Sequence, residues 1–88
     1  MIDDKRGAGG EDAAVEAAIL RQLLLIHPAQ VTVKELIVDV AADPEAFAER
    51  DAIERAVREL ARAGLVHRNG EFAIPSRAAL RFDELLGG

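Results

Sequence analysis

The sequence predicts a small, mostly α-helical fold with one β-hairpin, and three observations carry that prediction. Ile53, Val57 and Leu60 recur at the spacing of a helix with one buried face. Gly64 follows them and can end the helix in a left-handed conformation, and a turn at Asn69-Gly70 separates two short apolar strands. These strands are Leu65-Val66 and Phe72-Ala73-Ile74. A helix, a glycine and a hairpin in this order predict a helical core with a small sheet beside it.

The chain has 88 residues, enough for one small domain whose core is modest and would gain stability from a partner subunit. Half of the residues are hydrophobic, which excludes a disordered chain. Residues 1–10 are polar and glycine-rich, and ordering such a segment costs much conformational entropy. We therefore expect a flexible leader over residues 1–10 and a single domain over residues 11–88.

The first helix is expected to begin near Glu11, where acidic side chains suit the positive end of the helix dipole. It should end near His27, because Pro28 follows. Its main apolar stripe consists of Val15, Ile19, Leu23 and Ile26. Leu20 and Leu24 lie off this stripe, which indicates that the helix buries a second face.

A short extended segment over residues 29–31 should precede the second helix. Thr32 and Glu35 have the spacing of a capping box, in which a hydroxyl and a carboxylate satisfy each other's backbone N–H groups at a helix start. We expect this helix to end near Ala42. Its buried side would consist of Val33, Leu36, Ile37 and Val40.

The connection over residues 43–50 is longer than a minimal helix-turn-helix turn, and its Pro44 favours a short helical turn that buries Phe47. Asp51 and Glu54 repeat the capping-box spacing with an acidic cap, so the third helix is expected over residues 51–63.

A last helix should start at Ser76, directly after the hairpin and Pro75. We expect its apolar residues to face Leu20 and Leu24 of the first helix. These residues are Ala79, Phe82, Leu85 and Leu86.

The net charge of −5 argues against a general nucleic-acid binder, because phosphate contacts require cations. The charges are unevenly placed, however. Residues 1–49 hold four basic and ten acidic side chains, whereas residues 50–81 hold seven basic and four acidic ones. The positive balance therefore falls on the third helix and the hairpin.

Composition excludes several other functions. Without cysteine there is no disulfide, thiolate metal site or thiol nucleophile, and His27 and His67 lack further ligands at metal-binding spacing. The only serine and the only threonine are explained as helix caps, and no phosphate-binding glycine loop is present, so we expect no enzyme, cofactor or identifiable small-molecule ligand.

No secretory signal is visible and the longest apolar run is too short to span a bilayer, which predicts a cytoplasmic protein without membrane contact. Arginine heavily outnumbers lysine and alanine is abundant, as in GC-rich bacterial genomes.

The third helix carries an arginine stripe opposite its apolar face. Arg55, Arg58 and Arg62 point nearly away from the core side of the helical wheel. The planar guanidinium can bind guanine or phosphate through paired hydrogen bonds, which suits a DNA groove. A structural explanation stays open, because Asp51 can pair with Arg55, and Glu54 with Arg58, at helical i,i+4 spacing.

Two segments resemble the winged helix-turn-helix domains of bacterial transcriptional regulators. They are Thr32-Val33-Lys34-Glu35-Leu36 and Ala56-Val57-Arg58-Glu59-Leu60-Ala61-Arg62-Ala63-Gly64-Leu65-Val66, and the resemblance covers roughly residues 12–86. It implies a three-helix core, a two- to three-stranded wing sheet and a C-terminal helix. It also implies that the third helix enters the major groove of double-stranded DNA.

The implied DNA-binding residues are Arg50, Arg55, Arg58, Arg62, Thr32, Lys34, Arg68 and Asn69. Arg50 would reach phosphate near the start of the third helix, and Thr32 and Lys34 would meet the backbone, although the Thr32 cap serves its own helix with or without DNA. The wing departs from the usual pattern, because its tip offers one cation, Arg68, beside one anion, Glu71.

Two hypotheses follow. The first is a homodimeric, DNA-binding transcriptional regulator whose two recognition helices lie about 34 Å apart on a palindrome. Its dimer interface would consist of Leu20, Leu24, Leu80, Phe82 and Leu85. The second is a protein-interaction module of a larger bacterial assembly that does not bind DNA, which the negative net charge and the short wing favour, and in which this apolar surface would bind a different chain.

Overall fold

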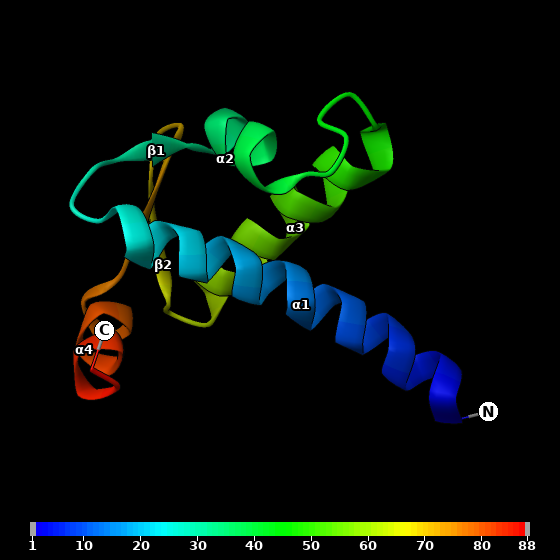
Figure 1. The fold of residues 1–88 in the computed structure, drawn as a ribbon, viewed down its shortest axis with the longest axis horizontal. Coiled ribbons are helices and arrows are strands. Elements are labelled where there is room, and N and C mark those ends of the chain that lie inside the picture. Colours follow the sequence, from blue (N-terminus) through cyan, green and yellow to red (C-terminus); the bar gives the residue numbers. More distant parts are fainter. Residues whose placement is uncertain (1, 88) are drawn as a thin grey trace.

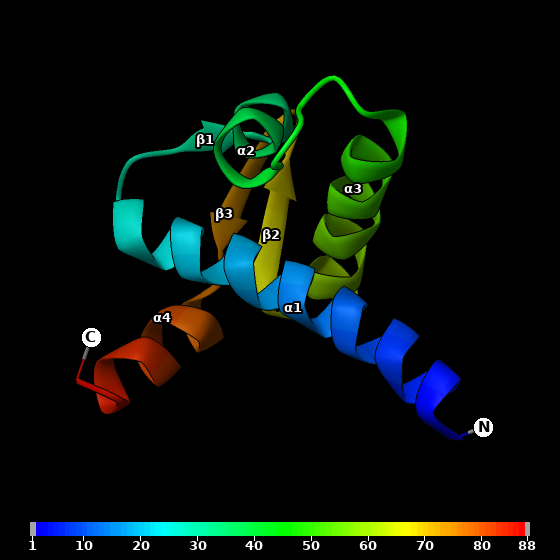
Figure 2. The ribbon, with the colours of Figure 1, turned by 45° about the vertical axis from the view of Figure 1, so that its right-hand side comes forward.

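A computed structural model describes residues 2–87, with side chains described from residue 11. The described residues form four helices and a three-stranded antiparallel sheet, so the predicted mostly helical fold with a small sheet is confirmed at this level. In order, the elements are α1 (Ile2–Ile26), β1 (Val31–Thr32), α2 (Val33–Val40), α3 (Phe47–Arg62), β2 (Val66–Asn69), β3 (Phe72–Pro75) and α4 (Arg77–Leu85). Figures 1 and 2 both show α2 and α3 on one side of α1 and α4 on the other.

Helix α1 begins at Ile2, nine residues before the expected start near Glu11, and ends one residue before His27. Residues 2–10, most of the segment expected as a flexible leader, belong to this helix, and their side chains lie outside the described residues. The expected apolar stripe is confirmed, because Ile19 and Leu23 are fully buried and Val15 and Ile26 pack against the core.

Helix α2 begins with the predicted capping box. The Thr32 hydroxyl oxygen accepts a hydrogen bond from the Glu35 backbone N–H at 3.1 Å, and the Thr32 N–H donates to Glu35 Oε1 at 2.8 Å. Two backbone donors that the helix itself cannot satisfy are thus satisfied by local side chains.

The connection between α2 and α3 corrects two predictions. Helix α3 begins at Phe47 and not at Asp51, and Phe47 is 74% exposed instead of buried. A longer-range contact explains the early start: Glu49 Oε1 accepts hydrogen bonds from the Ala42 and Asp43 N–H groups at 2.8 and 3.2 Å. Glu49 holds the end of α2 against the first turn of α3, and no cap at Asp51 is needed.

The hairpin is shifted by one residue from its predicted turn. Asn69 pairs with Phe72, so the two-residue loop is Gly70-Glu71 and not Asn69-Gly70. Gly70 has φ of 62°, whereas Glu71 is not among the residues with positive φ, and positive φ at the first loop residue alone fits a type II′ turn. Gly64, after the end of α3, has φ of 85° and confirms the predicted left-handed helix end.

Strand β1 fixes the hairpin beside the start of α2. In the sheet order β1-β3-β2, Val31 pairs with Ala73 and Thr32 with Phe72. The Val33 N–H donates to the Glu71 carbonyl oxygen at 2.9 Å, which extends this connection to the hairpin loop. The first turn of α2 and the tip of the hairpin are therefore neighbours by construction.

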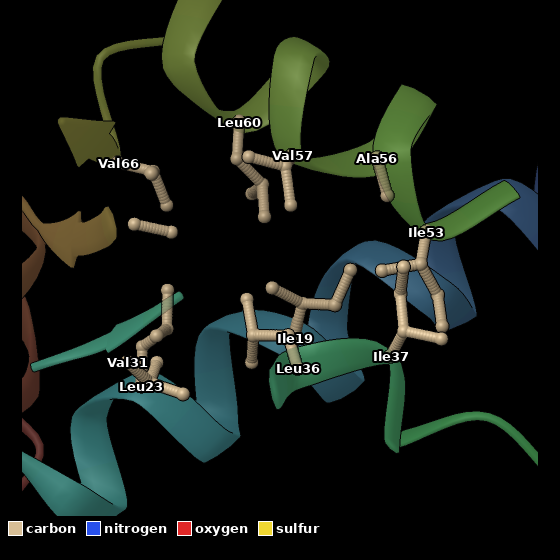
Figure 3. Packing of buried hydrophobic residues seen from close by; sticks show 11 residues of the cluster. Ile19, Leu23, Val31, Leu36, Ile37, Ile53, Ala56, Val57, Leu60 and Val66 are labelled. Atoms are coloured by element: carbon tan, nitrogen blue, oxygen red, sulfur yellow. The ribbon is translucent and has the colours of Figure 1, made fainter. Parts of the chain in front are cut away.

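The core lies between α1, α2, α3 and the sheet. Figure 3 shows the buried side chains of α1, α2 and α3 pointing toward one another, with Val31 and Val66 closing one side. Burying one large aliphatic side chain contributes about 1.5–3 kcal/mol, so this cluster is the main source of stability. Its members are Ile19, Leu23, Val31, Leu36, Ile37, Ile53, Ala56, Val57, Leu60, Val66 and Ala73.

Helix α4 starts as predicted but packs less than predicted. The Ser76 Oγ accepts from the Ala79 N–H at 3.2 Å and donates to the Gly64 carbonyl oxygen at 2.7 Å. Helix α4 contacts α1, and Ala79 is buried. Phe82, Leu85 and Leu86 stay exposed, so the expectation that they cover Leu20 and Leu24 within one chain is wrong. The reason is the shortness of α4, whose single buried residue leaves the rest of its apolar face unpaired.

Among the residues searched, no helix combines the length and the apolar character that crossing a bilayer requires.

Candidate nucleic-acid interface

The start of α2, the exposed side of α3 and the hairpin enclose a groove of about 350 Å³. Its position follows from the fold: Ile53 and Val57 are buried in the core while Glu54 and Arg58, the next residue after each, are exposed, and β1 brings the hairpin tip to α2. Three cations and two carboxylates stand around it. The lining residues are Val33, Lys34, Ile37, Glu54, Arg58, Arg68 and Glu71.

Thr32 and Lys34 were predicted to meet a DNA backbone, and the structure places them differently. The Thr32 hydroxyl is engaged in the capping box, where it also lies 3.2 Å from Glu35 Oε1. Lys34 is exposed, lines the groove and forms no ion pair with a described carboxylate. Of these two residues, Lys34 is therefore the one whose polar group is available to a partner.

Arg58 is the α3 arginine that lines the groove. It is exposed and forms no ion pair with the carboxylates of residues 11–87. Glu54, four residues earlier, lines the same groove, yet the pair with Arg58 that helical spacing allows is not formed. A guanidinium and a carboxylate therefore stand side by side on α3, each with its hydrogen-bonding groups open to solvent.

Arg55 and Arg62 belong to a second hollow of about 470 Å³ on the α1 side of α3, which Asp12 and Glu16 also line. Arg55 Nε lies 3.2 Å from Asp51 Oδ2, the predicted i,i+4 pair, and Arg55 Nη1 lies 4.0 Å from Asp12 Oδ1. Arg62 Nη1 lies 3.4 Å from Glu59 Oε2. Both side chains remain accessible, at 51% and 77% exposure, but each shares its charge with neighbouring acids. Arg58 lines this second hollow as well as the groove, so the three arginines differ in their ion pairs and not simply in the hollow that each one lines.

The hairpin and the first turn of α3 supply the remaining predicted residues. Arg68 Nη2 donates to the Gly70 carbonyl oxygen at 2.9 Å, so the side chain curls over the hairpin tip and its charge stays at the groove. Asn69 is exposed at the end of β2. Arg50 is exposed one turn into α3 and is not among the residues that line the groove.

Sequence reasoning missed Asp12 as a neighbour of the predicted cations, whereas it placed Glu71 beside Arg68 at the hairpin tip, and both of these residues line the groove. Asp12 reaches Arg55 from another helix, and no local spacing signals that contact.

The predicted dimer-interface residues differ in how far they are buried. Leu20 packs partly against the core of its own chain, and Leu24 and Leu80 are half-buried. Phe82 and Leu85 are 60% and 66% exposed on α4. The accessible part of this surface is therefore the outer face of α4.

Comparisons of this chain with protein-family models, with curated proteins and with solved structures find no match.

Proposed function

We propose that the chain is a winged-helix DNA-binding protein that acts as a homodimeric transcriptional regulator, with α3 as the recognition helix and the β2–β3 hairpin as the wing. One observation carries the proposal: Lys34, Arg58 and Arg68, from three separate elements, surround one groove beside the exposed side of α3. Cations held by a rigid core at fixed spacing suit a regular array of phosphates.

The net charge of the chain does not oppose this proposal once the charges are placed. The acidic excess of −6 belongs to residues 1–49, whereas the groove holds three cations and two carboxylates. Lys34, at the first turn of α2, and Arg68, on the hairpin, flank Arg58 and would contact the two phosphate backbones beside the major groove.

Two chains together would double the phosphate contacts. Helix α4, which carries the exposed Phe82 and Leu85, lies on the side of α1 opposite α2 and α3, so a dimer formed through α4 would leave the groove uncovered. Two copies of α3 about 34 Å apart would meet successive turns of one DNA face.

Fluorescence anisotropy of a labelled duplex, titrated with protein at several salt concentrations, tests the proposal. Each phosphate contact contributes about −0.9 to the slope of log K against log[salt]. Lys34→Ala and Arg68→Ala should each make the slope shallower by about 1 per chain. Arg81→Ala removes the same charge from α4, where Arg81 pairs with Glu84 at 3.0 Å, and should leave the slope unchanged. Wild-type protein without salt-dependent DNA binding would refute the proposal.

A second candidate is a protein-interaction module without DNA binding, and the apolar surface outside α4 favours it. Leu25 and Val38 are largely exposed on α1 and α2, apart from the predicted dimer surface. Under this hypothesis the purified chain is a monomer and shows no salt-dependent DNA binding. A dimer that binds duplex DNA would exclude it.

A further inference from the structure

We infer that Arg58 and Glu54 are the base-reading pair of α3, and that each DNA half-site carries a guanine and a cytosine no more than about two base-pair steps apart. This inference rests on the proposed DNA binding and deepens it, because it names the residues that determine sequence specificity. Arg58 donates to guanine O6 and N7, and Glu54 accepts from the cytosine N4 amino group.

The case for Arg58 comes from the ion pairs of the arginine stripe. Arg55 lies 3.2 Å from Asp51, and Arg62 lies 3.4 Å from Glu59, whereas Arg58 forms no ion pair with the carboxylates of residues 11–87. The Arg58 guanidinium therefore does not have to break an ion pair before it binds a base. A bidentate contact to guanine is the commonest specific contact of arginine in the major groove.

The case for Glu54 comes from its place in the same groove without a bonded cation. Four residues before Arg58 it could pair with that arginine, but no such ion pair forms. Phosphates repel a carboxylate, so Glu54 favours complex formation only if it finds a hydrogen-bond donor on the DNA. In the major groove, the typical base contact of a carboxylate is a hydrogen bond accepted from the cytosine N4 amino group.

The geometry of α3 limits the spacing of the two bases. Four residues of helix rise about 6 Å, and base pairs are stacked about 3.4 Å apart. A recognition helix that follows the groove therefore places Glu54 and Arg58 over base pairs no more than about two steps apart. Lys34 and Arg68, at the edges of the groove, offset the charge of Glu54.

Selection of bound duplexes from a random pool, followed by affinity measurements on the selected and singly changed sequences, tests the inference. The wild type should select a guanine and a nearby cytosine, each preferred by about 5- to 150-fold, the range for one good side-chain contact to a base. Arg58→Ala should remove the guanine preference alone. Glu54→Gln should remove the cytosine preference, with equal or tighter binding to non-matching DNA.

Glu71→Gln is the matched control, because it removes the same charge from the same groove while its backbone carbonyl still accepts from Val33. It should tighten binding to all sequences equally and leave the selected motif unchanged. Circular dichroism confirms that each variant is folded. If the wild type binds but Arg58→Ala keeps the motif, or Glu54→Gln behaves as Glu71→Gln does, the inference is wrong while the proposed function stands. If the wild type binds no sequence, the proposed function fails first.

Discussion

Replacing Ser76 by alanine should destabilise the protein by more than the loss of a simple helix cap, because its hydroxyl makes two hydrogen bonds. It accepts from the Ala79 N–H at 3.2 Å, which caps α4, and donates to the Gly64 carbonyl oxygen at 2.7 Å, which joins α4 to the end of α3. A Ser N-cap contributes about 1 kcal/mol, and a further hydrogen bond about 0.5–1.5 kcal/mol. Their sum is about 2 kcal/mol.

For a domain of this size, 1 kcal/mol corresponds to about 4–8 °C in the melting temperature. The Ser76→Ala variant should therefore melt about 8–16 °C below the wild type, with a matching decrease of the midpoint in urea and an unchanged m-value. Circular dichroism at 222 nm follows both transitions. The Ser76 backbone N–H bond to the Leu65 carbonyl is kept in every variant, so the comparison isolates the hydroxyl.

Two further variants separate the two bonds. Ser76→Thr keeps a hydroxyl and should lose little stability. Ser76→Asp keeps an acceptor for the Ala79 N–H but presents no donor to Gly64, so it should fall between the wild type and Ser76→Ala. A loss below about 0.5 kcal/mol for Ser76→Ala, the range of ordinary surface changes, would refute this assignment.

Three other predictions follow from the core, the charges and the apolar face of α4. Leu36→Ala should lower the free energy of unfolding by about 2–5 kcal/mol, because this side chain is fully buried; urea unfolding with a smaller loss would contradict the core assignment. Asp12→Asn should release Arg55 from its contact with α1 and tighten the proposed DNA binding up to about fivefold at low salt, because exposed ion pairs contribute about 0.2–1 kcal/mol. Unchanged anisotropy titrations would show that the Asp12–Arg55 contact does not affect DNA binding. If the chain forms the proposed dimer, Phe82→Glu should convert it into a monomer without lowering the melting temperature, and a sedimentation mass equal to that of a dimeric wild type would contradict a contact through α4.

The parts of the fold that the sequence predicted correctly are those that depend on neighbouring residues. The Thr32–Glu35 capping box, the left-handed Gly64 and the Ser76 cap each act within a few residues of their own position. Because such contacts do not depend on how the chain packs, spacing alone was enough to place them.

The failures have a common physical cause, which is competition between a local signal and a contact from elsewhere. Asp51 has the spacing of a cap, but Glu49 satisfies the connecting backbone from inside α3 and moves the helix start to Phe47. The hairpin turn moved by one residue because Asn69 pairs with Phe72 and so belongs to β2. A two-residue loop then has to begin at Gly70, the residue that tolerates positive φ.

The same competition decides which arginine of α3 is free. On the helical wheel Arg55 and Arg58 are equivalent, since each follows an acid by four residues. They differ in their ion pairs: Asp12, from α1, adds a second carboxylate to the Asp51–Arg55 pair, whereas Arg58, which lines both hollows, forms no ion pair with the carboxylates of residues 11–87. Spacing along the chain therefore could not distinguish the two arginines, because each has an acid four residues earlier and, of these two pairs, only Asp51–Arg55 forms. The groove that results is the surface on which DNA binding should be measured first.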